Sequence, residues 1–231
     1  SNAILASTSN NIGRFVPDHF ALLGASFTNR SDIASCFDTF NYMGESFNTA
    51  FTLSARNSSN GTTQNYADSF ALLDSYGELG MAAADSGTDL SARLAIGSNA
   101  PSINWPAAGT ASAGVASISV DLKLNRDATV DGPFNSLQLG IAPSDGDAVL
   151  NSFDLDVDNN SIDDHALLAA TVIRYGRTLI ENAFGPETSD LDIPMQMQYF
   201  DGSSFVVNGD DNCSSYIMGS VSLDHSAYSG D

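Results

Sequence analysis

The chain has 231 residues, of which 42% are hydrophobic, so it can bury a substantial core as one large domain or two small ones. Its charge balance is strongly acidic, because 28 Asp and Glu residues stand against 8 Lys and Arg, a formal net charge of −20. Nucleic-acid binding requires clustered basic residues that replace counterions on phosphates, and this composition excludes that class. The same charge argues against direct insertion of this segment into an anionic membrane.

The two ends of the sequence suggest an excised piece of a longer protein. Residues 1–3, Ser-Asn-Ala, have the form of a scar left by removal of an expression tag, so fold prediction is restricted to 4–231. No signal peptide and no apolar run of membrane-spanning length occurs. We therefore expect 4–231 to be a fragment, without a membrane span of its own.

Alternating apolar and polar residues predict short strands along most of the chain. The predicted strands lie at 47–55, 92–96, 117–124, 137–141 and 193–199. Pro194 cannot donate to a sheet ladder, so it predicts the start of a strand or an edge strand. Helical periodicity is rare and is limited to 66–73 and to 163–170, which is long enough for two turns.

Turn-forming dipeptides separate these predicted strands. Asp-Gly occurs at 131–132, 145–146 and 201–202, and this dipeptide suits the positive φ angles of tight hairpins. The last one predicts a hairpin between 195–200 and 205–208. Many short strands with regular turn signals favour an all-β fold of the sandwich type, Ig-like or jelly-roll-like, with few short helices.

A segment rich in Ala, Gly, Ser and Pro runs from 97 to 114. It has two interpretations: a linker between two β units, or a long surface loop anchored by Trp105. The sequence leaves both open.

The two cysteines, Cys36 and Cys213, form no CxxC pair, which excludes a zinc ribbon or thioredoxin-like motif. We expect them to form an intramolecular disulfide, with unpaired buried thiols or partners outside this segment as the alternatives. Such a bridge indicates the periplasm or the cell exterior.

An acidic stretch at 154–164 is the strongest candidate for a metal site. Calcium takes six to eight oxygen ligands, and alternating Asp and Asn residues on a curved loop would supply several of them. The sequence departs from the EF-hand pattern, since Asn159 replaces the turn glycine and the bidentate Glu is missing. Calcium and a solvated acidic turn are the two interpretations, and the candidate ligands are Asp154, Asp156, Asp158, Asn160 and Asp164.

No catalytic motif is recognisable in the sequence. A G-x-S-x-G elbow and an H-E-x-x-H pair are both missing, and the three histidines are His19, His165 and His225. Two carboxylates would suffice for a glycosidase, but so many acids make that signal unspecific. Arg174 and Arg177 are expected to pair with carboxylates in so acidic a chain. We predict that the protein is not an enzyme.

Four stretches of the sequence carry a resemblance to a known family. They are 14–22 (RFVPDHFAL), 40–55 (FNYMGESFNTAFTLSA), 62–66 (TTQNY) and 174–213, from RYGRTLIENAF to FVVNGDDNC. Together they resemble a large, uncharacterised region near the C-terminus of the MshQ family. That family accompanies biogenesis of the mannose-sensitive haemagglutinin pilus, a type IV pilus of Gram-negative bacteria. The resemblance implies an exported protein of the cell surface or periplasm, and it supplies no catalytic residues.

Two functions from different classes follow from these observations. The first is a structural or interaction module of a pilus-associated surface protein, with pilus or envelope proteins as partners. The alternative is a calcium-assisted carbohydrate-binding adhesin module, with glycans as partners.

Overall fold

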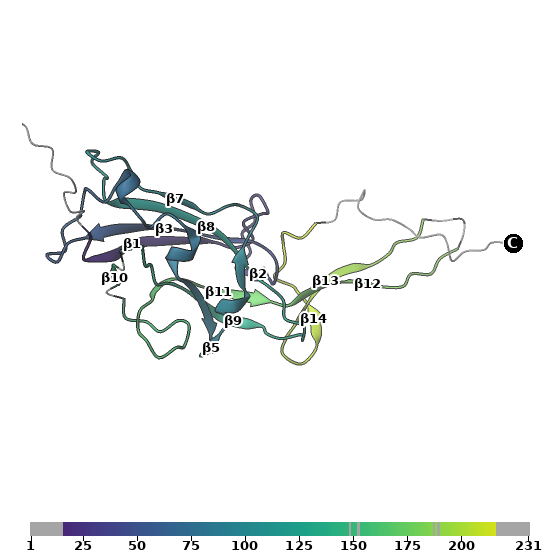
Figure 1. The fold of residues 1–231 in the computed structure, drawn as a ribbon. Coiled ribbons are helices and arrows are strands. Elements are labelled where there is room, and N and C mark those ends of the chain that lie inside the picture. Colours follow the sequence, from purple (N-terminus) through teal and green to yellow (C-terminus); the bar gives the residue numbers. More distant parts are fainter. Residues whose placement is uncertain (1–15, 148, 152, 187, 189, 216–231) are drawn as a thin grey trace, which may run out of the picture.

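The computed structural model describes residues 16–147, 149–151, 153–186, 188 and 190–215. Fourteen strands and three short 3-10 helices make up its regular structure. None of the described residues lies in an α-helix. The all-β, sandwich-like fold predicted from the sequence is therefore confirmed (Figure 1).

The first sheet has six strands in the order β10-β1-β3-β8-β6, with β7 also paired to β8. All neighbours are antiparallel except β1 and β10, which run parallel over two residue pairs. The strands are β1 (His19–Thr28), β3 (Phe47–Arg56), β6 (Leu94–Ile96), β7 (Ser102–Asn104), β8 (Val115–Leu124) and β10 (Leu150–Asn151).

The second sheet has five strands in the order β2-β11-β9-β4-β5. Here β2 lies parallel to β11 and the other neighbours are antiparallel. The strands are β2 (Phe40–Tyr42), β4 (Met81–Asp85), β5 (Thr88–Asp89), β9 (Phe134–Ile141) and β11 (Ala166–Arg174).

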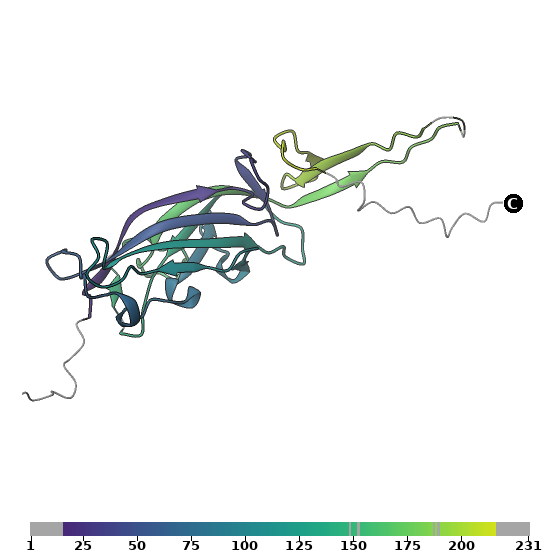
Figure 2. The same cartoon turned by 90° about the horizontal axis from the view of Figure 1, so that it is seen from above.

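The two sheets, together called the sandwich below, face each other across one apolar core (Figures 1 and 2). In β3 and in the second half of β9, alternate residues point into this core, as the period of two in the sequence predicts. Leu53 and Val120 of the first sheet and Leu137 and Leu139 of the second have no exposed surface. Burying each such side chain stabilises the fold by roughly 1.5–3 kcal/mol.

The helical predictions had mixed outcomes. At 66–73 the structure has one 3-10 turn, η1 (Asp68–Phe70), and two more follow at η2 (Tyr76–Leu79) and η3 (Ser91–Arg93). The two helical turns predicted at 163–170 are wrong, because Ala166 begins strand β11. Two register irregularities, at Leu168 and Val172, break the alternation that identifies a strand in sequence.

Segment 97–114 contains strand β7, which pairs with β8. Trp105 packs against Phe20 and Tyr66, and its indole N–H donates to the Leu73 carbonyl at 2.7 Å. β3, which precedes the segment, pairs with β8, which follows it.

A third sheet of three strands, called the ribbon below, projects from one end of the sandwich (Figures 1 and 2). Its strands are β12 (Gly176–Ile180), β13 (Met195–Phe200) and β14 (Phe205–Val207). Only Tyr175 separates β11 from β12, so a nearly continuous strand passes from the sandwich into the ribbon. The predicted hairpin at 201–202 joins β13 to β14, and Gly202 adopts the positive φ (102°) that the turn requires.

Candidate functional site

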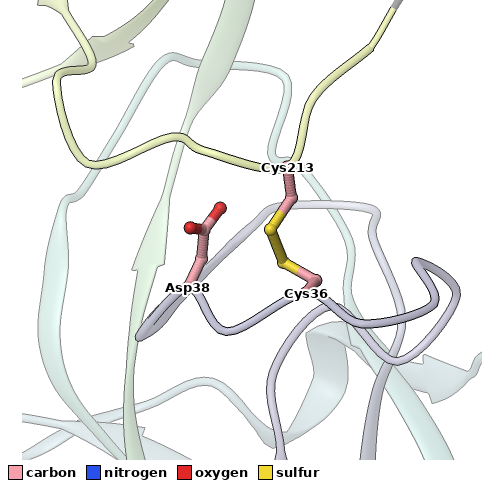
Figure 3. Close-up of side chains that lie close together, drawn as sticks. All are labelled: Cys36, Asp38 and Cys213. Atoms are coloured by element: carbon pink, nitrogen blue, oxygen red, sulfur yellow. A yellow bond between two sulfur atoms is a disulfide. The ribbon is translucent and has the colours of Figure 1, made fainter.

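The disulfide between Cys36 and Cys213 ties the sandwich to the segment that follows the ribbon (Figure 3). Cys36 lies between β1 and β2, whereas Cys213 lies beyond β14. The two Cα atoms are 5.6 Å apart and 177 residues separate the cysteines in sequence. Closing so long a loop restricts the unfolded chain and stabilises the folded one.

Arg30 lies beside this bridge and its side chain is only 1% exposed. Its backbone has a left-handed conformation, with φ at 46°, and its N–H donates to the Asn41 side-chain oxygen at 2.7 Å. The guanidinium carbon is 5.3 Å from the ring centroids of both Phe40 and Tyr42. Strand β2 therefore supplies a cation–π environment for a buried positive charge.

Three carboxylates surround the Arg30 guanidinium. Asp38 and Asp211 each accept a hydrogen bond from Nη1 at 2.7 Å, and a Glu45 oxygen lies 3.1 Å from Nε. Burial alone would lower the pKa of Arg30, but Asp211, Glu45 and Asp38 outweigh burial and raise that pKa. The guanidinium is therefore charged and joins groups from both ends of the chain.

Asp211 is held by the same contacts, and only 3% of its side chain is exposed. Burial would raise its pKa, but hydrogen bonds from Ser214 and Arg30 outweigh burial and lower it to about 2. Its second oxygen accepts a hydrogen bond from the Tyr42 hydroxyl at 3.0 Å. The Tyr42 hydroxyl in turn accepts a hydrogen bond from the Asn208 amide. Burial is the main cause that raises the pKa of Tyr42, so its hydroxyl is a neutral donor.

These groups are called the junction cluster below, because they join the sandwich to residues after the ribbon. Its members come from the β1–β2 region and from the segment after β14, and they meet around one disulfide. They are Arg30, Cys36, Asp38, Tyr42, Glu45, Asn208, Asp211 and Cys213.

Further arginines flank the junction cluster, each over an aromatic ring. The Arg174 guanidinium carbon lies 4.4 Å from the Tyr199 centroid, and its Nη2 is 2.6 Å from Asp210. Arg177 lies 3.8 Å from the Phe205 centroid and donates to the Gln198 side-chain oxygen rather than to a carboxylate. With Arg30 and with Arg126, which donates to the Gly176 carbonyl at 2.7 Å, four of the eight basic residues gather here.

Gly176 brings the backbone of β12 directly against Tyr42 of the sandwich. A Cβ atom at this position would overlap the ring of Tyr42. Only glycine lets β12 pass directly against the tyrosine that holds Asp211.

The junction cluster contains a group with metal-ligand chemistry, namely Cys36, Asp38 and Cys213, whose ligand atoms lie within 4.8 Å of one another (Figure 3). The two sulfur atoms are bonded to each other, so neither is the thiolate that a metal requires. Asp38 already accepts hydrogen bonds from Arg30 and the Asn212 backbone. No other group of three His, Cys, Asp or Glu ligands lies this close together within the described residues.

The predicted calcium ligands lie on a loop between β10 and β11, closed by a bridge between Leu155 and His165. The Asp156 carboxylate accepts backbone N–H groups from Asn160 and Ser161 at 2.9 and 2.8 Å. Burial acts to raise the pKa of Asp156, but these N–H donors together outweigh it and lower that pKa.

Two further acidic residues of this stretch have partners close to them in sequence, and Asp158 shares the Asn160 N–H with Asp156. Asp158 accepts from the Asn160 side chain at 2.8 Å, and Asp164 is 2.7 Å from the His165 ring. Asp154 is exposed. Calcium binding by this loop stays a prediction.

The described surface includes two clefts of different character. A hollow of about 530 Å³ on the first sheet is lined by small and apolar side chains such as Ser26, Ala50 and Thr52, with no titratable group. A second cleft, of about 320 Å³, lies between the junction cluster and the ribbon and is lined in part by Arg30, Thr178 and Met197. Only the second cleft brings charged groups and apolar side chains together.

Sequence reasoning identified the two cysteines but missed Arg30 and its carboxylates. A signal was present, because an acidic residue lies two positions from each cysteine, at Asp38 and Asp211. Arg30 is also one of only eight basic residues in an acidic chain.

These observations define a class of structure: an all-β sandwich with a ribbon attached to it by a disulfide and a buried arginine. The chain belongs to the DUF6701 family, an uncharacterised domain family: the model of its third domain matches residues 1–171 and that of its fourth domain matches 174–231. The sandwich thus corresponds to the third domain and the ribbon to the fourth. Comparison with curated proteins and comparison with solved structures both gave no match.

The described residues include no helix long and apolar enough to cross a membrane. The disulfide is compatible with an exported protein.

Proposed function

We propose that this chain is a structural and interaction module of an exported surface protein associated with a type IV pilus of the mannose-sensitive haemagglutinin type. In this role the sandwich is the rigid base and the ribbon is presented to other pilus or envelope proteins. The protein performs no chemistry of its own, and it works at the surface or in the periplasm of a Gram-negative bacterium.

The junction cluster is the observation that carries the proposal. The ribbon has three strands, the last only three residues long, and no residue of these strands belongs to the buried core. A sheet this small needs a packed hydrophobic face for independent stability. Here a disulfide and a buried guanidinium shared by Asp38 and Asp211 fasten it to the sandwich. These two attachments hold the ribbon in a fixed orientation. A binding surface that is already ordered loses less entropy when it contacts a partner, which supports a role of the ribbon in binding.

The pilus assignment is supported by the resemblance of 14–22, 40–55, 62–66 and 174–213 to the MshQ family. The disulfide supports export, because such bonds persist in oxidising compartments. The net charge of −20 supports protein partners rather than nucleic acid.

The test is cross-linking on intact piliated cells that produce the full-length protein with an affinity tag. We expect pilus or envelope proteins to be recovered covalently attached, and to be missing from an isogenic strain without pili. Recovery of the same proteins from both strains would exclude the pilus assignment. Turnover of a glycan or peptide substrate by the purified chain would overturn the non-enzymatic role.

A further inference from the structure

We propose that the outer edge of β12 binds an extended segment of another polypeptide, with alternating apolar residues flanked by Lys or Arg, as an added strand of the ribbon. This inference rests on the proposed function and deepens it, because it names the binding surface and the chemistry of the partner. Strand addition to an open sheet edge takes its affinity from backbone hydrogen bonds and its specificity from alternate side chains.

The edge of β12 is open at Thr178 and Ile180, whereas the outward-facing carbonyl of Gly176 accepts a hydrogen bond from Arg126 at 2.7 Å. The ribbon has the order β12-β13-β14, so β12 pairs with β13 on one side and with no strand of the described residues on the other. The Phe200 N–H donates to the Tyr175 carbonyl, and the Glu181 N–H donates to the Pro194 carbonyl. In this antiparallel register the N–H and C=O groups of Thr178 and Ile180 point away from β13, where an incoming strand would meet them.

One face of the ribbon next to this edge is apolar. Thr178 lies opposite Met197, and Ile180 lies opposite Met195, so these four side chains share a face. Ile180 is 59% exposed, and Ile193, just before β13, is 46% exposed. Apolar side chains of an added strand would pack beside Thr178 and Ile180. Towards the sandwich the same face opens into the cleft of about 320 Å³ lined by Thr178, Met197 and Ile33.

The charge beyond the Ile180 end of this edge selects the partner, because Arg126 and Arg177, at the Gly176 end, are already engaged by groups of the chain itself. Between 176 and 200 the sequence has one basic residue, Arg177, against four acidic residues. Arg177 is engaged by Phe205 and Gln198 on the opposite face, whereas Glu181, Asp190 and Asp192 are exposed. Lys or Arg residues flanking an incoming strand would meet these acids. A second copy of the chain, which also carries −20, would be repelled.

The long exposed edge of β1 is blunted, and that of β12 is not. β1 pairs with β10 only at His19 and Phe20, but its register with β3 shifts at Leu23. A bulge of this kind twists an edge and discourages pairing. β12 runs in continuous register over all five residues, without proline or lysine.

The test uses the full chain and a short synthetic peptide of alternating valine and threonine with a lysine at each end. We expect calorimetry to detect binding, and we expect N-methylation of every second peptide amide to weaken it by at least about tenfold. Replacing the terminal lysines with glutamates should weaken it by a similar factor. No binding of the lysine peptide, or equal binding of all three peptides, would overturn the proposal.

Ile180→Pro is the informative variant, because its N–H points outward and proline there removes no bond of the β12–β13 ladder. We expect it to lose peptide binding while the Cys36–Cys213 disulfide still forms and the thermal midpoint stays close to that of the unchanged chain. Val207→Pro is the matched control, since Val207 is 57% exposed and its N–H also points away from β13, at the opposite edge of the ribbon. Unchanged binding by a folded Ile180→Pro protein would overturn the edge assignment.

A photo-cross-linker at position 180 of the full-length protein in cells identifies which polypeptide occupies the outer edge of β12. A cross-link to a different protein, lost when that protein's basic flanking residues are replaced, supports the proposal. A cross-link to a second copy, or to residues 216–231 of the same chain, would overturn it. Pilus proteins recovered with Ile180→Pro as efficiently as with the unchanged chain would refute the β12 site and leave the proposed function standing.

Discussion

Gly176 lies where β12 of the ribbon passes against Tyr42 of the sandwich, and it has no room for a side chain. In Gly176→Ala the added Cβ would meet the ring of Tyr42, so β12 or the tyrosine must shift. Overpacking of this kind costs about 1–3 kcal/mol, and we expect urea unfolding to show that loss. Gly209→Ala is the matched control, because no atom lies within 4 Å of a Cβ built there. Equal free energies of unfolding for the two variants would show that Tyr42 or β12 can shift without loss of stability.

Asp211 gives the junction cluster a predictable acid response. Its pKa is about 2 in the folded protein, compared with about 3.9 in an unfolded chain. A carboxyl whose pKa is depressed by folding stabilises the protein above the unfolded value and loses that contribution as the pH falls through the folded value. We therefore expect stability to fall between about pH 4 and pH 2.

Asp211→Asn should be less stable at pH 7 and should show less of this acid-dependent loss, measured as the free energy of unfolding against pH. Asp74→Asn, at an exposed position, is the control and should follow the unchanged protein. A parallel pH profile for Asp211→Asn and the unchanged chain would contradict the role of Asp211.

At the scale of the element, the acidic loop at 154–164 organises itself around Asp156. Asp156→Ala removes the acceptor of two backbone N–H groups, from Asn160 and Ser161, so we expect the thermal midpoint to fall by a few degrees at most. Asp154→Ala, at the exposed start of the loop, should leave the midpoint unchanged without calcium. A fall as large in Asp154→Ala would contradict this account.

The same pair of variants tests the calcium prediction. If the loop coordinates calcium through Asp154, millimolar calcium will raise the midpoint of the unchanged protein and not that of Asp154→Ala. If calcium leaves the thermal midpoint of the unchanged protein the same and calorimetry detects no heat of binding, the loop does not bind calcium.

Strands were predictable where one face is buried and the register is regular. β3 and β8 pair over eight residues without a shift, and the alternation of their apolar residues predicted both. β11 was mistaken for a helix over 163–170, because its two register irregularities place Leu168 in the core while Leu167 stays 40% exposed. A local pattern carries no information about where a partner strand will shift.

The candidate site was predictable only as far as its cysteines. A pairing between Cys36 and Cys213 follows from their being the only two, but the position of Arg30 depends on contacts across 181 residues with Asp211. Its burial between Phe40 and Tyr42 likewise depends on the β1–β2 loop folding back. Long-range ion pairs leave no periodicity in a sequence, and the acids beside the cysteines are the only local trace.

At the scale of the molecule, one disulfide links the two regions that match the third and fourth domain models of the family, in addition to the continuous chain. Cys36 lies in the part that matches the third domain and Cys213 in the part that matches the fourth. The chain passes between them at Tyr175, and the junction cluster adds a second connection at Asn208 and Asp211, which follow Tyr175 by 33 and 36 residues. Two attachments restrict a rigid-body rotation that a single strand crossing would allow.

The double variant Cys36→Ser with Cys213→Ser tests this restriction. Removing a bridge across 177 residues has an entropic ceiling of about 5 kcal/mol, so we expect a loss of about 2–5 kcal/mol in the free energy of unfolding. Small-angle scattering should show a broader distribution of interatomic distances than in the oxidised chain, and reduction of the unchanged protein should reproduce it. If the distance distribution stays the same while the free energy of unfolding falls, Arg30 and its carboxylates are sufficient to orient the ribbon. In that case the ion pairs hold the ribbon in place without the disulfide. If both stay the same, the disulfide has no part in the rigidity on which presentation of the ribbon depends.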